Sequence, residues 1–292
     1  MTRAIELAVN EITLVLFTTL APAGILACVA LALALGFGRL PDDARSRLAH
    51  CMVVPLVVAL IGLVASATQL GTPSNALYVL TGVGRSPLSN EVAWALVFLA
   101  LCGSHWLYSF SLQVHRALQR VWCAAIALSG CGAVVAIGFA YQAPTILTWG
   151  SALVPVALAS SALGGAPLLV AATVRMARIS LDGCVRWVLL GCGVAASVAT
   201  VVLLGAQWHA MGTMRNALGT AAELVPIYPV LIGAYGAGAL GAYGLAIAAY
   251  RRGTAVLPRA GLLVGASVAY FAGLFAVRFG FYMAHMTVGI SL

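Results

Sequence analysis

Residues 12–37 read ITLVLFTTLAPAGILACVALALALGF, and no charged side chain interrupts them. A helix needs about 20 mostly apolar residues to cross the hydrocarbon core of a bilayer. The run is too long for the apolar core of a signal peptide, and acidic Glu6 and Glu11 precede it in place of a basic leader. We therefore expect 12–37 to be a membrane-spanning helix that stays in the mature protein.

Seven further apolar runs of similar length follow along the sequence. They lie at roughly 50–69, 91–112, 120–141, 152–174, 185–207, 228–250 and 260–282. The breaks between the runs are short and hold most of the charge and proline, so none has room for a soluble domain. The sequence predicts an all-α integral membrane protein, with a single domain over 1–292 built as an eight-helix transmembrane bundle.

Composition excludes several classes of protein. Of the 292 residues, 63% are hydrophobic and 8% are charged, whereas about a quarter of the residues of a soluble domain are charged. So few charges cannot cover a globule of this size in water. A soluble enzyme, a disordered chain and a nucleic-acid-binding domain are excluded, and the expected surroundings are a lipid bilayer.

The arginines predict the orientation of the protein in the membrane. All 15 basic residues are arginines, and most lie in the loops that follow spans 1, 3, 5 and 7. These are Arg39, Arg45, Arg47, Arg116, Arg120, Arg175, Arg178, Arg186, Arg251, Arg252 and Arg259. Cytoplasmic loops carry an excess of basic residues. We therefore expect both termini, and the long loops 70–90 and 208–227, on the outer (periplasmic) side.

Cysteine and histidine spacing argues against a metal site. The seven cysteines lie in or beside apolar runs and form no C-x-x-C pair, so we interpret them as small buried hydrophobes. His105 is the one histidine well inside a span, which leaves a bis-histidine haem without a second ligand. We expect His105 to be packed and hydrogen-bonded beside Trp106, and the protein to hold no haem or iron–sulfur cluster.

Polar residues at membrane depth need a reason, and Glu91 is the acidic residue that opens an apolar run. Ser89 or Asn90 before it is a good helix N-cap, and a carboxylate in the first turn favours the helix dipole. Two interpretations stay open at this point. Glu91 either stabilises the start of a helix or accepts a proton at the membrane–water boundary.

The segment between spans 2 and 3 is rich in hydrogen-bonding groups. Amides, hydroxyls and a cation occur within about twenty residues, at Gln69, Thr72, Asn75, Tyr78, Arg85 and Asn90. A quinone headgroup needs partners for two ring oxygens, an apolar slot and a proton acceptor, but a simple polar turn has the same composition. Near the C-terminus lie Arg278, Tyr282 and His285. They either anchor the protein at the outer membrane interface or form a second wall of the same quinone pocket, in which Arg278 pairs with Glu91.

The sequence resembles the membrane-anchor subunits of the dimethyl sulfoxide reductase family (DmsC-like). The resemblance covers the whole chain, and its most specific pieces are Leu70-Gly71-Thr72-Pro73 with Ala76-Leu77, Leu88-Ser89-Asn90-Glu91-Val92, and Arg278 to Gly289. Polysulfide-reductase-type anchors (NrfD/PsrC-like) are more distantly similar. The resemblance implies a multi-pass protein of the bacterial inner membrane.

The same resemblance implies a function. Such an anchor binds and oxidises menaquinol at its outer side and passes electrons to an iron–sulfur subunit, which feeds a molybdenum-cofactor catalytic subunit. The key glutamate of the family corresponds to Glu91. Its key histidine corresponds to Gln69, which can form hydrogen bonds but cannot take up a proton near neutral pH. The protein is then expected to be a quinol-oxidising subunit without the catalytic centre of the complex.

Two other functions stay open from the sequence. A secondary transporter would show two similar halves, interrupted spans and midplane ionisable residues, and the sequence shows no convincing similarity between its halves. An anchor without any role in electron transfer is the other alternative, and Gln69 makes it more credible.

Overall fold

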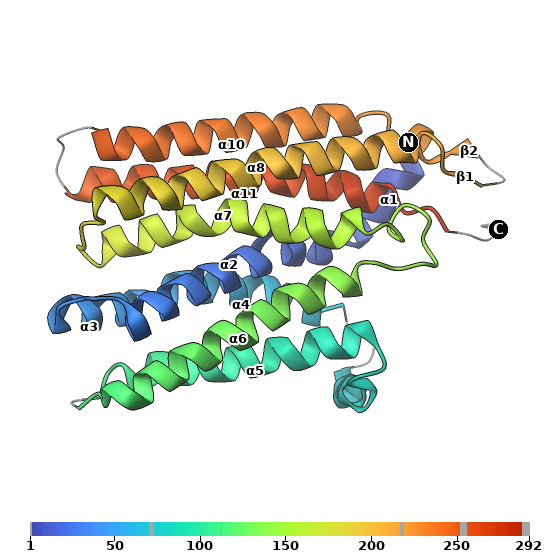
Figure 1. Cartoon of the computed structure of the whole chain (residues 1–292). Helices are drawn as coiled ribbons and strands as arrows, with labels where there is room; N and C mark the ends of the chain where they lie inside the picture. The colour runs from blue at the N-terminus through green and yellow to red at the C-terminus, as the bar shows by residue number, and fades with distance from the viewer. Residues whose placement is uncertain (1, 70–72, 112, 217–218, 252–255, 288–292) are drawn as a thin grey trace.

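The computed structural model describes residues 2–69, 73–111, 113–216, 219–251 and 256–287, with the side chains of 2–3, 73–77, 251 and 256–259 left aside. Eight helices in this part of the protein are long and apolar enough to cross a membrane. They confirm the expected all-helical membrane protein and match the predicted spans closely. Figure 1 shows them running side by side along a common direction.

The spanning helices are numbered among shorter elements. They are α2 (Ile12–Phe37), α3 and α4 (Asp42–Cys51 and Val53–Ala67, together one span), α5 (Pro87–Tyr108), α6 (Arg116–Ala140), α7 (Leu153–Met176), α8 (Gly183–Met211), α10 (Tyr228–Arg251) and α11 (Val256–Met283). The short elements are α1 (Thr2–Asn10), the 3₁₀ helix η1 (Pro73–Gly82), the strands β1 (Arg215–Asn216) and β2 (Gly219–Thr220), and α9 (Ala221–Leu224). The strands pair antiparallel.

Three details differ from the sequence-based expectation. The second span is longer than predicted, since α3 precedes α4 and brings Asp42 and its neighbours into the helix. Helix α5 begins at Pro87, because proline suits the first helical position. Helix α8 continues to Met211 and so takes His209 out of the predicted outer loop.

The spans of the described structure fall into two consecutive sets of four. Within each set, the first span packs against the second and the fourth, and the third span packs against the fourth. One set contains α2, α3–α4, α5 and α6, and the other contains α7, α8, α10 and α11. Figure 1 shows the two sets as separate layers. Because each set has an even number of spans, both enter the membrane from the same side. The two sets therefore share one main packing pattern and one direction, which hydropathy alone does not reveal.

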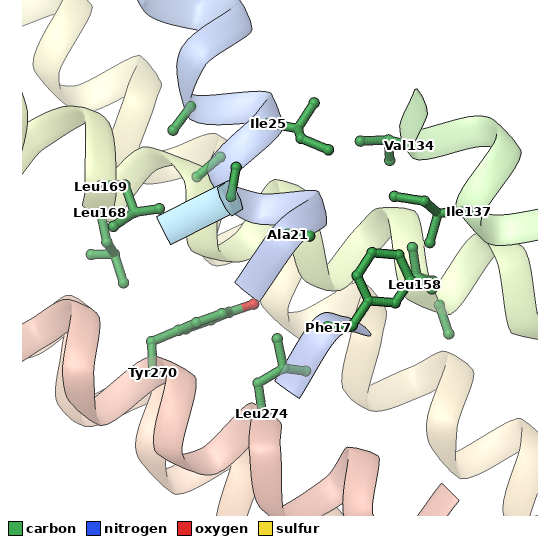
Figure 2. Close-up of a cluster of buried hydrophobic side chains, with 14 of the residues drawn as sticks. Phe17, Ala21, Ile25, Val134, Ile137, Leu158, Leu168, Leu169, Tyr270 and Leu274 are labelled. Atoms are coloured by element: carbon green, nitrogen blue, oxygen red, sulfur yellow. The ribbon is translucent and has the colours of Figure 1, made fainter. Parts of the chain in front are cut away.

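Helices α2 and α7 join the two sets and are the most buried of the eight spans. Both contain an internal proline, Pro22 in α2 and Pro167 in α7. Figure 2 shows Phe17 and Ile25 of α2 packed towards Val134 and Ile137 of α6 and Leu158 of α7, while Tyr270 of α11 approaches α2 from the other side. The core of the molecule therefore lies where the two sets meet.

On the arginine-rich side, arginine side chains form hydrogen bonds with backbone carbonyls at the C-terminal ends of helices. The Arg45 guanidinium donates to the carbonyls of Leu35, Gly38 (3.0 Å) and Leu40 (3.2 Å), which follow or end α2. Arg47 pairs with Asp43 at 2.8 Å, and its Nε donates to the Ala177 carbonyl at the end of α7. These bonds satisfy carbonyls that a helix leaves unpaired at its C-terminus.

The orientation of the bundle stays a prediction, which reporter fusions test. We expect fusions in 38–49 and 251–259 to report a cytoplasmic position and a fusion after Leu292 to report an external one, because the arginine excess lies on the first of these sides. Alkaline phosphatase and green fluorescent protein activities at each junction measure the two positions. The reverse pattern would overturn both the orientation and the assignment of an outer site.

Candidate functional site

Glu91 lies inside α5 and not at its start. The helix begins four residues earlier, at Pro87, with Ser86 as its N-cap, so the expectation that Ser89 or Asn90 caps the helix and that Glu91 occupies its first turn is wrong. Asn90 accepts instead from the Gly84 backbone N–H at 2.7 Å. The capping role therefore does not account for Glu91.

The Glu91 side chain is only 4% exposed. Within the described residues it forms neither a hydrogen bond nor an ion pair, although burying a carboxylate without a partner is costly. Ser89, next to Asn90 on α5, is also buried, and η1 packs so closely here that a Cβ on Gly82 would lie 2.5 Å from the Ser89 hydroxyl. The glutamate is thus buried near the start of α5, two residues after Ser89, on which η1 packs.

Tyr141 and Glu11 are neighbours of this region that sequence reasoning did not single out. The Glu91 carboxylate and the Tyr141 phenol are close enough to interact electrostatically, and Glu11, at the junction of α1 and α2, interacts with both Tyr141 and Tyr282. Two carboxylates and two phenols from different parts of the sequence therefore share one region. The sequence does carry a signal for Tyr141: a tyrosine ends both span 4 (Tyr141) and span 8 (Tyr282).

Tyr282 belongs to an aromatic cluster that closes the bundle between its two sets. Its ring meets those of Tyr141 and Trp149 edge-on, with centroids 6.1 and 5.4 Å apart, and its hydroxyl donates to the Leu14 carbonyl at 3.2 Å. Trp149 also stacks on Phe281 at 4.9 Å. The residues after α6 and α11 pair through Ile146 and Thr287, and this pairing joins the two segments that carry the aromatic cluster.

The structure does not place Arg278 against Glu91, so their predicted pairing is wrong. Arg278 is 4% exposed and lies about 7–8 Å inside the end of α11. Its Nη2 donates to the Ser161 hydroxyl of α7 at 2.8 Å. It is a buried residue and not the interfacial anchor that was the other interpretation. Because Arg278 and Tyr282 are four residues apart, they share one face of α11.

Tyrosines surround the Arg278 guanidinium. The phenols of Tyr228, Tyr235, Tyr270 and Tyr282 interact with it electrostatically. The Tyr235 and Tyr270 hydroxyls share a 2.8 Å hydrogen bond, and Tyr270 donates to the Ser161 carbonyl. The Arg278 Nε and the Tyr228 hydroxyl are buried without a partner among the described residues. The hydroxyl dipoles of these tyrosines and of Ser161 therefore stabilise the buried charge of Arg278.

The other predicted site residues spread over the end of the bundle that carries η1. Gln69, at the end of α4, is exposed and donates from Nε2 to the Asn10 carbonyl at 3.1 Å. Tyr78 is 71% exposed, and Arg85 is exposed too. Thr72 and the Asn75 side chain lie outside the described residues. The structure therefore brings Gln69 to the end of α1 and leaves Tyr78 and Arg85 facing outwards.

His105 is buried beside Cys123. Its Nε2 lies 3.6 Å from the Cys123 sulfur, its ring meets Trp122 edge-on, and its Nδ1 has no partner among the described residues. Cys28, Cys102 and Cys123 are buried as expected, whereas Cys131, Cys184 and Cys192 are exposed, so the expectation of burial is wrong for these three. In the described part of the protein, no three histidine, cysteine, aspartate or glutamate side chains gather in a way that could hold a metal ion.

Comparison with known proteins places this protein in a family. The family model of the DMSO reductase anchor subunit (DmsC) matches residues 6–282. The C subunit of the anaerobic dimethyl sulfoxide reductase of Escherichia coli is 31% identical over 284 residues, covering 97% of this protein and 98% of the relative. The anaerobic dimethyl sulfoxide reductase subunit YnfH of the same organism is 30% identical over 291 residues, covering 97% and 98%. The corresponding C subunit of Haemophilus influenzae is 29% identical over 224 residues, covering 76% and 78%. The protein therefore belongs to the DMSO reductase anchor subunit family and is a multi-pass membrane anchor.

Proposed function

We propose that this anchor binds menaquinol at its outer side, oxidises it and passes the electrons to an iron–sulfur subunit in anaerobic respiration. That subunit supplies a molybdenum-cofactor catalytic subunit, and the whole complex is attached to the bacterial inner membrane. The family supports the anchor role, and the relatives are named as parts of anaerobic dimethyl sulfoxide reductases. Glu91 is the observation that carries the step of quinol oxidation.

Glu91 suits the role of proton acceptor. It is buried and lies near the outer end of α5. Within the described residues, neither helix capping nor an ion pair explains why a carboxylate is buried there. A carboxylate that serves as a general base must lie within hydrogen-bond reach of the hydroxyl that loses its proton, and a position near the membrane–water boundary lets it release that proton to water. Intramembrane ionisable residues commonly mark such proton pathways.

Quinol oxidation requires an acceptor for protons and an acceptor for electrons. Each quinol that becomes a quinone releases two protons and two electrons. We assign both protons to Glu91 in succession: it accepts one, releases it towards outer water, and then accepts the other. We infer that Tyr141 and Glu11 lie along this exit, because Tyr141 interacts electrostatically with both carboxylates. The electrons go to the nearest iron–sulfur cluster of the partner subunit.

The remaining predicted residues have supporting roles in this proposal. Gln69 and Asn90 offer amides, Thr72, Asn75 and Tyr78 offer further polar groups, and Arg85 offers a cation along the approach to Glu91. Tyr282 contributes to the apolar aromatic wall, with Arg278 beneath it as the positive charge. The outer segments 70–90 and 208–227 are the surface on which we expect the iron–sulfur subunit to dock.

The composition of the complex tests the proposed function. Purification through a tag on this protein from anaerobically grown cells should yield an iron–sulfur protein and a molybdenum protein in equal molar amounts. Peptide mass spectrometry with iron and molybdenum analysis measures both. Recovery of the anchor alone from gently solubilised membranes would contradict the proposal.

Gln69 gives a more local expectation. Gln69→Leu removes the amide and should weaken binding of quinol or of a quinol-site inhibitor about fivefold, the usual effect of one lost hydrogen bond. Gln69→His should keep or raise turnover, because the imidazole can also exchange a proton. Inhibitor titration of quinol-dependent activity measures both variants.

Thr68→Val is the matched control for Gln69→Leu. Thr68 is the exposed neighbour of Gln69, and its hydroxyl donates to the Ala65 carbonyl of its own helix. The control should bind inhibitor as the unaltered protein does. Unchanged binding and turnover in Gln69→Leu would remove Gln69 from the site.

A further inference from the structure

A pocket of about 90 Å³ lies at the arginine-rich end of the second set of helices. It is formed where α7 and α10 end and where α8 and α11 begin, a place that Figure 1 shows on the side opposite to η1 and the strands. Its polar lining includes Arg175, Arg186, Ser180 and Tyr250, and Ile179 and Leu263 contribute apolar walls. A space of this size holds a group several times larger than a water molecule.

The two arginines of the pocket lack partners. The Nε atoms of Arg175 and Arg186 are buried, and neither makes a hydrogen bond within the described residues. The ion pairs found there join Arg47 to Asp43 and Arg116 to Asp42, so none involves these two guanidinium groups. The nearby carboxylate of Asp182 accepts from the Gly183 backbone N–H at the start of α8. Two positive charges thus face one cavity without an anion.

Aromatic rings hold one guanidinium in place. The Arg186 guanidinium lies 5.3 Å from the Trp187 ring centroid and 5.1 Å from that of Tyr250. Such cation–π contacts hold the guanidinium beside the rings, and its buried Nε–H makes no hydrogen bond within the described residues. A guanidinium edge matches the paired oxygens of a phosphate group. The geometry therefore favours a phosphate-type oxyanion.

We propose that this pocket binds the phosphodiester headgroup of an anionic phospholipid, such as phosphatidylglycerol or cardiolipin. The pocket lies in the end turns of the spans, where headgroups lie, and exposed Met176, Val185 and Val264 beside it offer an apolar surface for acyl chains. Trp187 is exposed as well, as befits an interfacial tryptophan. Basic pockets between spans are suited to anionic headgroups. The inference does not depend on quinol oxidation.

Lipid binding to the full-length protein, purified with the subunits that accompany it, tests the proposal. Native mass spectrometry should show that phosphatidylglycerol binds in preference to zwitterionic phosphatidylethanolamine. The double substitution Arg175→Gln and Arg186→Gln should weaken phosphatidylglycerol binding about thirtyfold, and each single change about fivefold, since each arginine near the surface adds a similar increment.

Arg178→Gln is the matched control. Arg178 is an exposed arginine in the turn after α7 and does not line the pocket, so its loss should change binding by less than about twofold. Equal binding of the two lipids, or no loss in the double variant, would overturn the proposal. Displacement of phosphatidylglycerol by millimolar inorganic phosphate would also overturn it and indicate a free-phosphate site. The comparison of the two lipids on the unaltered protein needs no substitution, so it is decisive even if a variant does not fold.

Discussion

Glu91→Gln should leave an assembled, membrane-inserted complex that has lost quinol-dependent activity by about a hundredfold or more, the usual contribution of a positioned general base. The amide keeps the size of the side chain but cannot accept the proton of a quinol. Activity with artificial dyes, which reduce the catalytic subunits directly, should be retained. Parallel assays with a quinol analogue and a dye on the same membranes measure the difference.

Glu6→Gln is the matched control for this experiment. Glu6 is an exposed acidic residue of α1, so its loss should leave both activities unchanged. Because the described structure gives Glu91 no capping bond, the thermal stability of the Glu91→Gln complex should also stay close to that of the unaltered complex. Near-normal quinol turnover in Glu91→Gln would remove its proton-accepting role.

Gly24→Leu should abolish most of the folded protein. A Cβ at Gly24 of α2 would lie 2.6 Å from the backbone nitrogen of Ala59 in α4, and one at Gly62 of α4 would lie 2.7 Å from that of Ala21. These are contacts between helix backbones, so no flexible side chain can move aside. Small residues permit such close helix crossings in membranes. Overpacking costs about 1–3 kcal/mol even where neighbours adjust, and here α2 must separate from α4.

Gly191→Leu is the control for the helix crossing. Gly191 is exposed on α8, and a Cβ there would meet nothing within 4 Å. Its leucine would face lipid, where leucine is favourable by about 0.5 kcal/mol. Size-exclusion chromatography of mildly solubilised membranes should show a sharp peak for Gly191→Leu and aggregate or nothing for Gly24→Leu. Equal peaks would show that the crossing at Gly24 tolerates a large side chain.

Hydropathy predicts the spans because it is a local property of the sequence. The run 12–37 matches α2 at both ends, since charge and glycine end it abruptly. The start of α5 was misplaced because polar Ser89 and Asn90 were interpreted as a cap, whereas Ser86 and Pro87 begin the helix. Both Ser86 and the pair Ser89 and Asn90 are residue types that cap helices. The helix begins after Ser86 because proline is favoured at the first helical position.

The site was less predictable because its members come from distant parts of the sequence. Glu91 could be selected by its position before an apolar run, but its burial beside Tyr141 depends on how α5 and α6 pack. Arg278 lies near the outer end of its span in the sequence, yet packing turns it towards Ser161 on α7. The four-plus-four arrangement likewise arises from contacts between helices and leaves little trace in hydropathy.

Reduction of the partner's iron–sulfur clusters by quinol tests the central claim most directly. The purified complex is reconstituted in lipid nanodiscs without oxygen, a menaquinol analogue is added, and electron paramagnetic resonance records the reduced clusters. We expect rapid reduction in the unaltered complex and very slow reduction in Glu91→Gln, with both fully reduced by dithionite. Clusters that stay oxidised in an intact unaltered complex, although dithionite reduces them, would contradict a quinol-oxidising anchor.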